Sequence, residues 1–204
     1  MSRFSVETSI NNPIDNSWPT LFNKKFIGIE RNGVIITNNN TPDNLEEIEL
    51  VPFACEGIKL MRLKQYRVVI FFNEPGIFNG KISGEKVEES NQILMKLFGE
   101  RGIRSIDGLY FSTTNFKEDL YSLPNKGMIQ KAERELKVDC STGYFVGDKL
   151  YDLKTGYKLG ITPVLVRSGV YEETLSKLNT FSNRHLRQKT KVFNNLLEFA
   201  ESLV

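Results

Sequence analysis

The stretch Phe26-Ile27-Gly28-Ile29-Glu30-Arg31-Asn32-Gly33-Val34-Ile35 decides the fold of this chain. Apolar or small residues run without interruption up to Glu30, and a polar turn with a glycine follows. Apolar residues at successive positions are typical of a parallel strand that helices cover on both faces. Its polar end therefore falls at the carboxyl edge of the sheet, where open α/β sheets bind ligands.

Short runs of this kind recur along the chain and alternate with longer amphipathic stretches. The pattern predicts parallel strands at Lys25–Glu30, Arg67–Phe72, Gly108–Ser112, Tyr144–Val146 and Pro163–Val166. Helices are expected at Ala54–Leu63, Lys86–Phe98, Met128–Leu136, Leu150–Leu159 and Glu172–Leu178, with a last one near Val192–Leu203. Strands that alternate with helices form βαβ units, so the sequence predicts an α/β fold with a central parallel sheet.

Two polar stretches stand outside this rhythm. Residues 1–23 show no strand or helix period and are interpreted as an N-terminal arm, either mobile or docked. Residues 24–204 are expected to form one domain, because 204 residues with 40% hydrophobic content bury one sizeable core. The segment Thr37–Glu49 is expected to be a loop that follows the first strand on the ligand-binding edge.

Composition excludes several classes of protein. With 27 Lys and Arg against 25 Asp and Glu, the net charge of +2 gives no bulk attraction for nucleic acid or an anionic membrane. No apolar run reaches the roughly 18 residues of a spanning helix, and the N-terminus lacks an apolar signal region, so a cytoplasmic protein is expected.

Cys55 and Cys140 are interpreted as buried, reduced thiols. The single histidine, His185, lies among basic residues that predict a solvated face, or else a local patch for phosphate or an acidic partner.

Six separated segments resemble, in order, the motifs of phosphatases of the haloacid dehalogenase superfamily. Residues 30–35 are similar to the Asp-Arg-Asp-Gly-Val-Ile segment that opens these enzymes. The others are Phe72-Asn73-Glu74-Pro75-Gly76-Ile77 with Gly80-Lys81, Ile106-Asp107-Gly108-Leu109-Tyr110, Leu123-Pro124-Asn125-Lys126-Gly127-Met128, Phe145-Val146-Gly147-Asp148-Lys149-Leu150-Tyr151-Asp152 and Val164-Leu165-Val166-Arg167-Ser168-Gly169. The resemblance covers about residues 24 to 170 and favours the D-glycero-D-manno-heptose 1,7-bisphosphate phosphatases, with the histidinol-phosphate phosphatases beside them. It implies a Rossmann-like, three-layer α/β sandwich.

The resemblance places the family's two catalytic aspartates at Glu30 and Asn32. In the family the first forms an aspartyl phosphate and the second protonates the leaving group. The Glu30 carboxylate reaches one methylene further out, and a misplacement of about 1 Å costs on the order of 10²-fold in rate. Asn32 exchanges no proton near neutral pH, and losing acid–base catalysis costs roughly another 10²–10⁴. Efficient phosphatase catalysis is therefore not expected, and a new acid/base pair for other chemistry is the alternative interpretation.

The groups that bind phosphate and zinc in the family are also replaced. Phe72 stands in place of a phosphate-binding threonine, and Leu123 stands in place of a lysine. Asn73, Lys149 and Lys126 remain as candidate phosphate-binding side chains. The resemblance places the family's zinc-ligand positions at Ser112, Thr114, Asp119 and Tyr121 of this chain. None of these residues offers a thiolate or an imidazole, so no zinc is expected.

The fourth motif, Gly147-Asp148-Lys149 with Asp152, is intact. The resemblance assigns Mg²⁺ to Asp148, with Glu30 as the second carboxylate. One or two carboxylates hold Mg²⁺ when substrate phosphates complete its shell, so any magnesium binding is expected to be weak. A second interpretation of Asp148 is a helix cap, because aspartate is favoured there.

These residues predict a phosphatase-like protein that has lost efficient catalysis and has a binding or regulatory role. Its ligand is expected to be a small phosphorylated molecule or a protein partner. The alternative is a slow Mg²⁺-dependent phosphomonoesterase for a small sugar phosphate or histidinol phosphate, with Glu30 as nucleophile and Lys149 neutralising phosphate. A third hypothesis, compatible with the first, is that the protein is an interaction subunit that binds a partner through the N-terminal arm and the Thr37–Glu49 loop.

Overall fold

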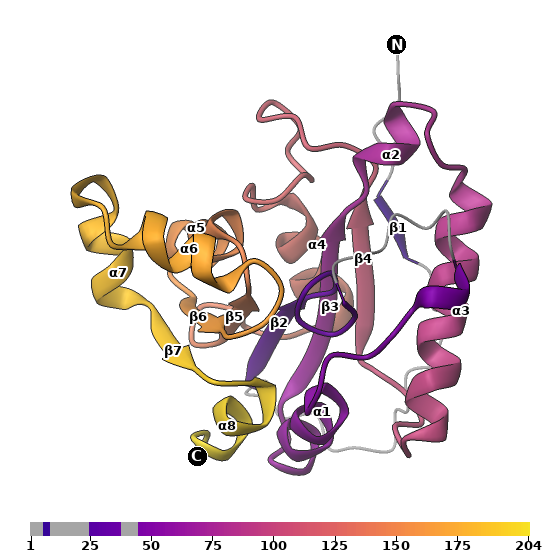
Figure 1. Ribbon diagram of the computed structural model, residues 1–204, viewed down its shortest axis with the longest axis horizontal. Helices are drawn as coiled ribbons and strands as arrows, with labels where there is room; N and C mark the ends of the chain where they lie inside the picture. The colour runs from indigo at the N-terminus through magenta and orange to yellow at the C-terminus, as the bar shows by residue number, and fades with distance from the viewer. Residues whose placement is uncertain (1–5, 9–24, 38–44) are drawn as a thin grey trace.

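The computed structural model describes residues 6–8, 25–37 and 45–204. Within these residues a seven-stranded sheet crosses the molecule in the order β1-β4-β3-β2-β5-β6-β7 (Figure 1). The strands are β1 (Val6–Thr8), β2 (Phe26–Glu30), β3 (Arg67–Asn73), β4 (Gly108–Ser112), β5 (Tyr144–Gly147), β6 (Thr162–Val166) and β7 (Lys191–Phe193). All but β1 run parallel to their neighbours, which is the Rossmann-like α/β arrangement that the sequence predicts.

Helices cover both faces of the sheet. They are α1 (Ala54–Leu63), α2 (Pro75–Phe78), α3 (Gly84–Glu100), α4 (Gly127–Leu136), α5 (Leu150–Leu159), α6 (Tyr171–Leu178), α7 (Arg184–Lys189) and α8 (Leu196–Glu201), with 3₁₀ turns at Leu45–Glu47 and Phe181–Asn183. No helix in the described part of the chain is long and apolar enough to cross a membrane.

Strand β3 shows why the central strands are apolar at every position. Val68, Ile70 and Phe72 belong to the core that also contains residues of α1, α3 and α8. Val69 and Phe71 alternate with them and face the opposite layer, which contains α4. Because successive side chains of a strand point to opposite faces, burial of both faces requires an unbroken apolar run.

The predicted elements between Lys25 and Leu178 are present, with ends within two residues of the expected ones. The helix predicted near Val192–Leu203 is wrong at its start. There the chain forms β7 on the sheet edge, and α8 begins only at Leu196. The side chain of Asn195 accepts a hydrogen bond from the backbone N of Glu198 at 2.9 Å, so it caps α8 and separates it from the strand.

Within residues 1–23, interpreted as a mobile or docked arm, residues 6–8 form β1, which docks antiparallel to β4 and was not predicted as a strand. A three-residue edge strand is held by backbone hydrogen bonds and needs no apolar pattern, so sequence periodicity does not reveal it. The rest of the predicted arm and residues 38–44 of the predicted loop lie outside the described residues. Cys55 and Cys140 are both buried and free, in agreement with the sequence.

Helices α1 and α8 lie side by side (Figure 1) and pack closely at Gly57. A Cβ atom there would lie 2.7 Å from the carbonyl oxygen of Leu196, whereas a Cβ on Gly99 of α3 would meet nothing within 4 Å. We expect Gly57→Ala to lower the free energy of unfolding by about 1–3 kcal/mol through this clash. The matched control Gly99→Ala should raise it by about 0.5–1 kcal/mol, because alanine favours helix. Urea unfolding measures both, and equal effects at the two sites would contradict the described packing.

Candidate active site at the carboxyl edge of the sheet

Three buried carboxylates gather where adjacent parallel strands end. Glu30 is the last residue of β2, Asp148 follows β5, and Asp152 lies in the first turn of α5. All three are buried, and β2 pairs directly with β5. We call these residues, together with Lys149, the acidic centre. The structure therefore brings together Glu30, Asp148 and Lys149, as the order of the sequence motifs predicts.

The ammonium group of Lys149 is the cation of this centre. Its Nζ lies 3.2 Å from Oδ1 of Asp148 and 3.9 Å from Oε1 of Glu30, and it donates a hydrogen bond of 2.8 Å to the backbone oxygen of Asn32. One ammonium faces three carboxylates. Oε2 of Glu30 and Oδ1 of Asp152 are buried without a hydrogen-bond partner among the described residues. The centre therefore has an excess of negative charge that a proton or another cation must offset.

Backbone hydrogen bonds fix two of the carboxylates in place. Oδ2 of Asp148 accepts from the backbone N of Val170 at 2.9 Å, in the loop after β6. Oδ2 of Asp152 accepts from the backbone N of Lys149 at 3.0 Å, so Asp152 satisfies the start of α5. Gly147 makes room for this arrangement, because a Cβ atom there would lie 2.1 Å from Cβ of Asp152.

Burial changes the ionisation of the centre. It raises the pKa of Glu30 to about 8; Lys149 opposes this rise, and the charge of Asp148 adds to it. Burial and the nearby charge of Glu30 also raise the pKa of Asp152 well above its usual range. Burial disfavours the charged form of Lys149, but the charges of the three carboxylates outweigh it and raise its pKa. Near neutral pH a proton therefore resides on the carboxylates when no other cation is present.

The donor set fits one divalent cation. Glu30 and Asp148 are the residues that would hold Mg²⁺, a hard ion that prefers carboxylate oxygens, and the buried unpartnered Oε2 of Glu30 is the atom with capacity for it. No group of three or more acidic, histidine or cysteine side chains is arranged to hold a metal ion within the described ranges. Two carboxylates alone make a weak, open site that other ligands must complete.

Arg31 forms a buried network beside the acidic centre that sequence analysis missed. Its Nε donates to Oδ1 of Asn32 at 2.9 Å, and its Nη1 donates to Oδ1 of Asn91 at 2.7 Å. Nη2 lies 3.7 Å from Oε2 of Glu74, and the guanidinium lies 3.4 Å from the centre of the Phe72 ring. Burial lowers the pKa of Arg31 to about 10, and Glu74 opposes this shift. The side chain oxygen of Asn32 is thus occupied by Arg31.

Asn73 and Lys126 are the other predicted phosphate-binding residues. Both lie at the carboxyl edge of the sheet, but their surroundings differ. Both amide hydrogens of Asn73 are engaged, because Nδ2 donates to Oγ of Ser122 at 3.1 Å and to the backbone oxygen of Leu123 at 3.0 Å. Its Oδ1 accepts from the backbone N of Leu123 at 3.0 Å. Asn73 therefore holds the loop before α4, while Lys126 precedes that helix and is exposed. Their binding of phosphate stays a prediction.

The positions of the family's zinc ligands form a hydrogen-bonded knot around Asp119. Its Oδ2 accepts from the hydroxyls of Ser112, at 3.0 Å, and of Thr114. Its Oδ1 accepts from the backbone N of Tyr121 at 2.9 Å. All of these groups except Tyr121 are buried. A carboxylate and its donors thus organise this loop in the described structure.

The protein thus has an α/β fold with a mainly parallel sheet and with buried carboxylates at the carboxyl edge of that sheet. Comparison with known proteins shows which family shares this fold and site. Residues 121–199 match the HAD-hydrolase-like family model. The chain is 30% identical over 176 residues to D-glycero-D-manno-heptose-1,7-bisphosphate 7-phosphatase of Chlorobaculum tepidum, covering 79% of this chain and 88% of the relative. It is also 30% identical over 155 residues to the corresponding phosphatase of Yersinia pestis, covering 70% of this chain and 80% of the relative.

Solved structures agree with the fold. The crystal structure of D,D-heptose 1,7-bisphosphate phosphatase from B. bronchiseptica, complexed with magnesium and phosphate, superposes with a TM-score of 0.76 at 21% identity, covering 87% of this chain and 96% of that one. The corresponding structure from Burkholderia thailandensis gives 0.59 at 25% identity, covering 87% and 97%. The chain belongs to the haloacid dehalogenase superfamily, in the branch of the D-glycero-D-manno-heptose-1,7-bisphosphate phosphatases.

The raised pKa of Glu30 has a consequence for stability. Its pKa is about 8 in the folded protein against an ordinary value of 4.5, so the folded protein retains a proton that the unfolded chain loses above pH 4.5. As the pH rises from 5 to 8 in metal-free buffer, the free energy of unfolding of the native protein should fall by about 2–4 kcal/mol more than that of Glu30→Gln. Urea unfolding at several pH values measures the difference. The exposed control Glu100→Gln should follow the native curve, and a constant offset for Glu30→Gln would contradict the raised pKa.

The Asp119 knot makes a separate prediction about zinc. Asp119→Ala would leave the buried hydroxyls of Ser112 and Thr114 without an acceptor and should lower the free energy of unfolding by about 2–4 kcal/mol. A chelator should leave the melting temperature of the native protein unchanged, and elemental analysis should find no stoichiometric zinc. One zinc per chain, or a chelator effect as large as that of Asp119→Ala, would contradict this account of the loop.

Proposed function

We propose that this chain is a pseudo-phosphatase of its family, which has lost efficient phosphoryl transfer and has a binding or regulatory role. The observation that carries the proposal is the pair Glu30 and Asn32 at the end of β2. Glu30 is buried, and without a metal ion its pKa is about 8, so near neutral pH the metal-free site holds it mostly as a neutral acid, which is a poor nucleophile. Asn32 has no titratable proton, and its side chain oxygen accepts from Arg31.

The packing around the site supports the same conclusion. Phe72, at the position of the family's threonine, is fully buried beneath the guanidinium of Arg31, and Leu123, at the position of the family's lysine, is buried in the core that contains α4. Both side chains therefore pack in the interior of the protein and contribute to its core. Among the described residues, Lys149 is the cation within the acidic centre that would neutralise a phosphate dianion, and it already faces three carboxylates.

The second candidate is a slow Mg²⁺-dependent phosphomonoesterase for a small sugar phosphate or histidinol phosphate. The acidic centre favours it, because Glu30 and Asp148 remain close to one ammonium group. The relatives that match this chain are named heptose bisphosphate phosphatases. Bound Mg²⁺ would supply positive charge that favours the ionised form of Glu30 and offsets phosphate repulsion. Glu30 would then attack phosphorus as the bond to the substrate's oxygen breaks, and the departing alkoxide would take its proton from water, because Asn32 has none to give. Lys149 would stabilise the phosphoryl oxygens, and a second water would hydrolyse the carboxyl phosphate and release phosphate.

A phosphate-release assay separates the two candidates. With Mg²⁺ present, the native protein should hydrolyse heptose bisphosphate, histidinol phosphate or an aryl phosphate at least about 10⁴-fold more slowly than an intact site. The double variant Glu30→Asp, Asn32→Asp should regain part of the activity, because it restores a shorter nucleophile and a proton donor. Adding Phe72→Thr and Leu123→Lys should restore more phosphate binding, but both changes open the core, so folding must be verified.

The matched control combines Asn32→Asp with Glu30→Gln, which keeps the acid/base group and removes the nucleophile. It should stay inactive. Native turnover of about 1 s⁻¹ or faster that disappears in Glu30→Gln would contradict the pseudo-phosphatase proposal and establish the second candidate.

A further inference from the structure

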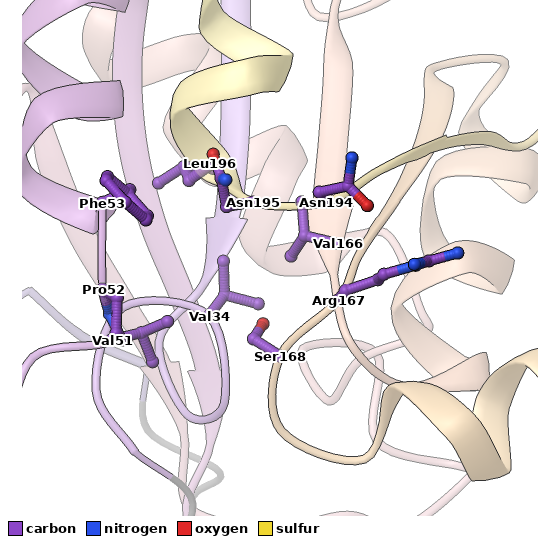
Figure 2. A pocket seen from close by; sticks show the side chains of 10 residues that line it. All are labelled: Val34, Val51, Pro52, Phe53, Val166, Arg167, Ser168, Asn194, Asn195 and Leu196. Carbon is purple, nitrogen blue, oxygen red and sulfur yellow. The ribbon is translucent and has the colours of Figure 1, made fainter.

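A pocket of about 190 Å³ opens beside the acidic centre, at the carboxyl ends of β6 and β7 (Figure 2). Four segments form it: the loop after β2, the residues before α1, the loop after β6 and the residues that join β7 to α8. The volume equals that of about six water molecules, or of one substituted six-membered ring, since a water occupies about 30 Å³ of liquid. The pocket therefore suits a ligand of a single ring.

The walls of the pocket are apolar and held by the fold. Val34, Val166 and Leu196 are buried residues of the main core whose side chains line the pocket. The backbone around them is hydrogen-bonded, because the N of Val51 donates to Ile35 at 2.9 Å and the N of Arg167 donates to Phe193 at 3.1 Å. The pocket is thus formed before any ligand arrives, which lowers the entropic cost of binding.

Phe53 provides an aromatic surface at the rim. Its side chain is 52% exposed, although its backbone has a φ of 65°, in the left-handed region that favours glycine. A left-handed conformation costs a residue with a Cβ about 1–2 kcal/mol, and here it is adopted by a large apolar side chain that packing does not bury. Figure 2 shows the ring at one side of the pocket, where it provides a flat apolar face for a second ring.

One polar group in the wall of the pocket has no partner among the described residues. The Oγ of Ser168 is buried and makes no hydrogen bond within the described part of the chain. It lies below the pocket in Figure 2, beside Val34. The amide of Asn194 lies on the opposite rim, whereas the Arg167 side chain points away from the pocket, and its Nε donates to the hydroxyl of Tyr171 at 3.1 Å. The pocket thus offers hydrogen-bonding groups and no directed charge.

We propose that this pocket binds a small, uncharged, planar aromatic or heteroaromatic molecule, whose ring lies between Phe53 and the valine walls and whose polar edge pairs with Ser168 after rotation of that side chain turns its buried hydroxyl toward the pocket. The ligand's ring fills apolar volume that water occupies poorly, and its donor or acceptor satisfies the buried hydroxyl. None of these residues belongs to the acidic centre, so the site does not depend on phosphoryl transfer or on its loss.

The pocket is also connected to the acidic centre through two loops. Ser168 shares its loop with Val170, whose backbone N holds Asp148, and Val34 shares its loop with Asn32, whose backbone oxygen accepts from Lys149. A ligand in the pocket thus packs against the segments that position the acidic centre, which fits a regulatory ligand.

The test is a titration of ¹⁵N-labelled full-length protein with phenol and nicotinamide, followed by amide NMR spectra, with cyclohexanol as a non-planar probe of similar size. We expect the planar probes to shift amides of the pocket loops and to bind with a Kd of about 1 mM, and cyclohexanol to bind at least about 5-fold more weakly. Phe53→Gly should weaken the planar probes about 10-fold, and Ser168→Ala about 3-fold to 10-fold.

Phe53→Gly keeps the test independent of folding, because glycine adopts the left-handed backbone without strain and should raise the midpoint of urea unfolding. The control Phe78→Ala removes an aromatic side chain of similar exposure, 50%, in α2, which does not line the pocket, and should leave binding unchanged. Absence of pocket shifts with both planar probes at 10-fold above the expected Kd would overturn the proposal. So would binding that Phe53→Gly leaves intact.

Discussion

The ammonium group of Lys149 lies against the carboxylates of Glu30 and Asp148 and donates to the backbone oxygen of Asn32, and the chemistry of the site depends on this contact. It joins the ends of β2 and β5 in a buried region where three carboxylates share one positive charge. Because charge is costly to bury, the remaining negative charge is offset by protons, which explains the raised pKa of Glu30. The same shortage of positive charge gives the site capacity for a divalent cation and weakens it as a binding site for a phosphate dianion.

The fold was predictable because it depends on patterns that the sequence carries directly. Strands β2 and β3 are apolar at successive positions, as burial on both faces requires, and the order of the motifs places Glu30 and Asp148 at one edge. Strand β1 was not predictable, because three edge residues are held by backbone hydrogen bonds with β4. The β7–α8 boundary depends on a single cap, Asn195, inside a stretch of plausible helical pattern.

The candidate site was predictable in its residues and less so in their contacts. The resemblance identified Glu30, Asn32 and Asp148, but it gave no sign that Arg31 occupies the oxygen of Asn32. Asn73 was expected to face a phosphate, yet its amide is engaged with the loop at Leu123, which only the three-dimensional arrangement reveals. The available signal in the sequence was Arg31 itself, because an arginine within an apolar strand-to-turn segment must find polar partners. In the structure those partners include Asn91 and Glu74.

The replacements form a consistent set. Where the family carries zinc ligands, hydroxyls and Asp119 form a hydrogen-bonded knot, and where it carries a threonine, Phe72 stacks beneath Arg31. At these two places the substituted side chains make contacts that contribute to packing. These contacts support the proposal that the chain has a binding role.

Intact-protein mass spectrometry after incubation with Mg²⁺ and an aryl phosphate tests the central claim most directly, because phosphoryl transfer in this family passes through a covalent carboxyl phosphate. The account predicts an unmodified mass for the native protein under acid quench, alongside an adduct of one phosphoryl group for an active relative treated in parallel. A phosphoryl adduct on the native protein, located at Glu30 and absent in Glu30→Gln, would contradict it.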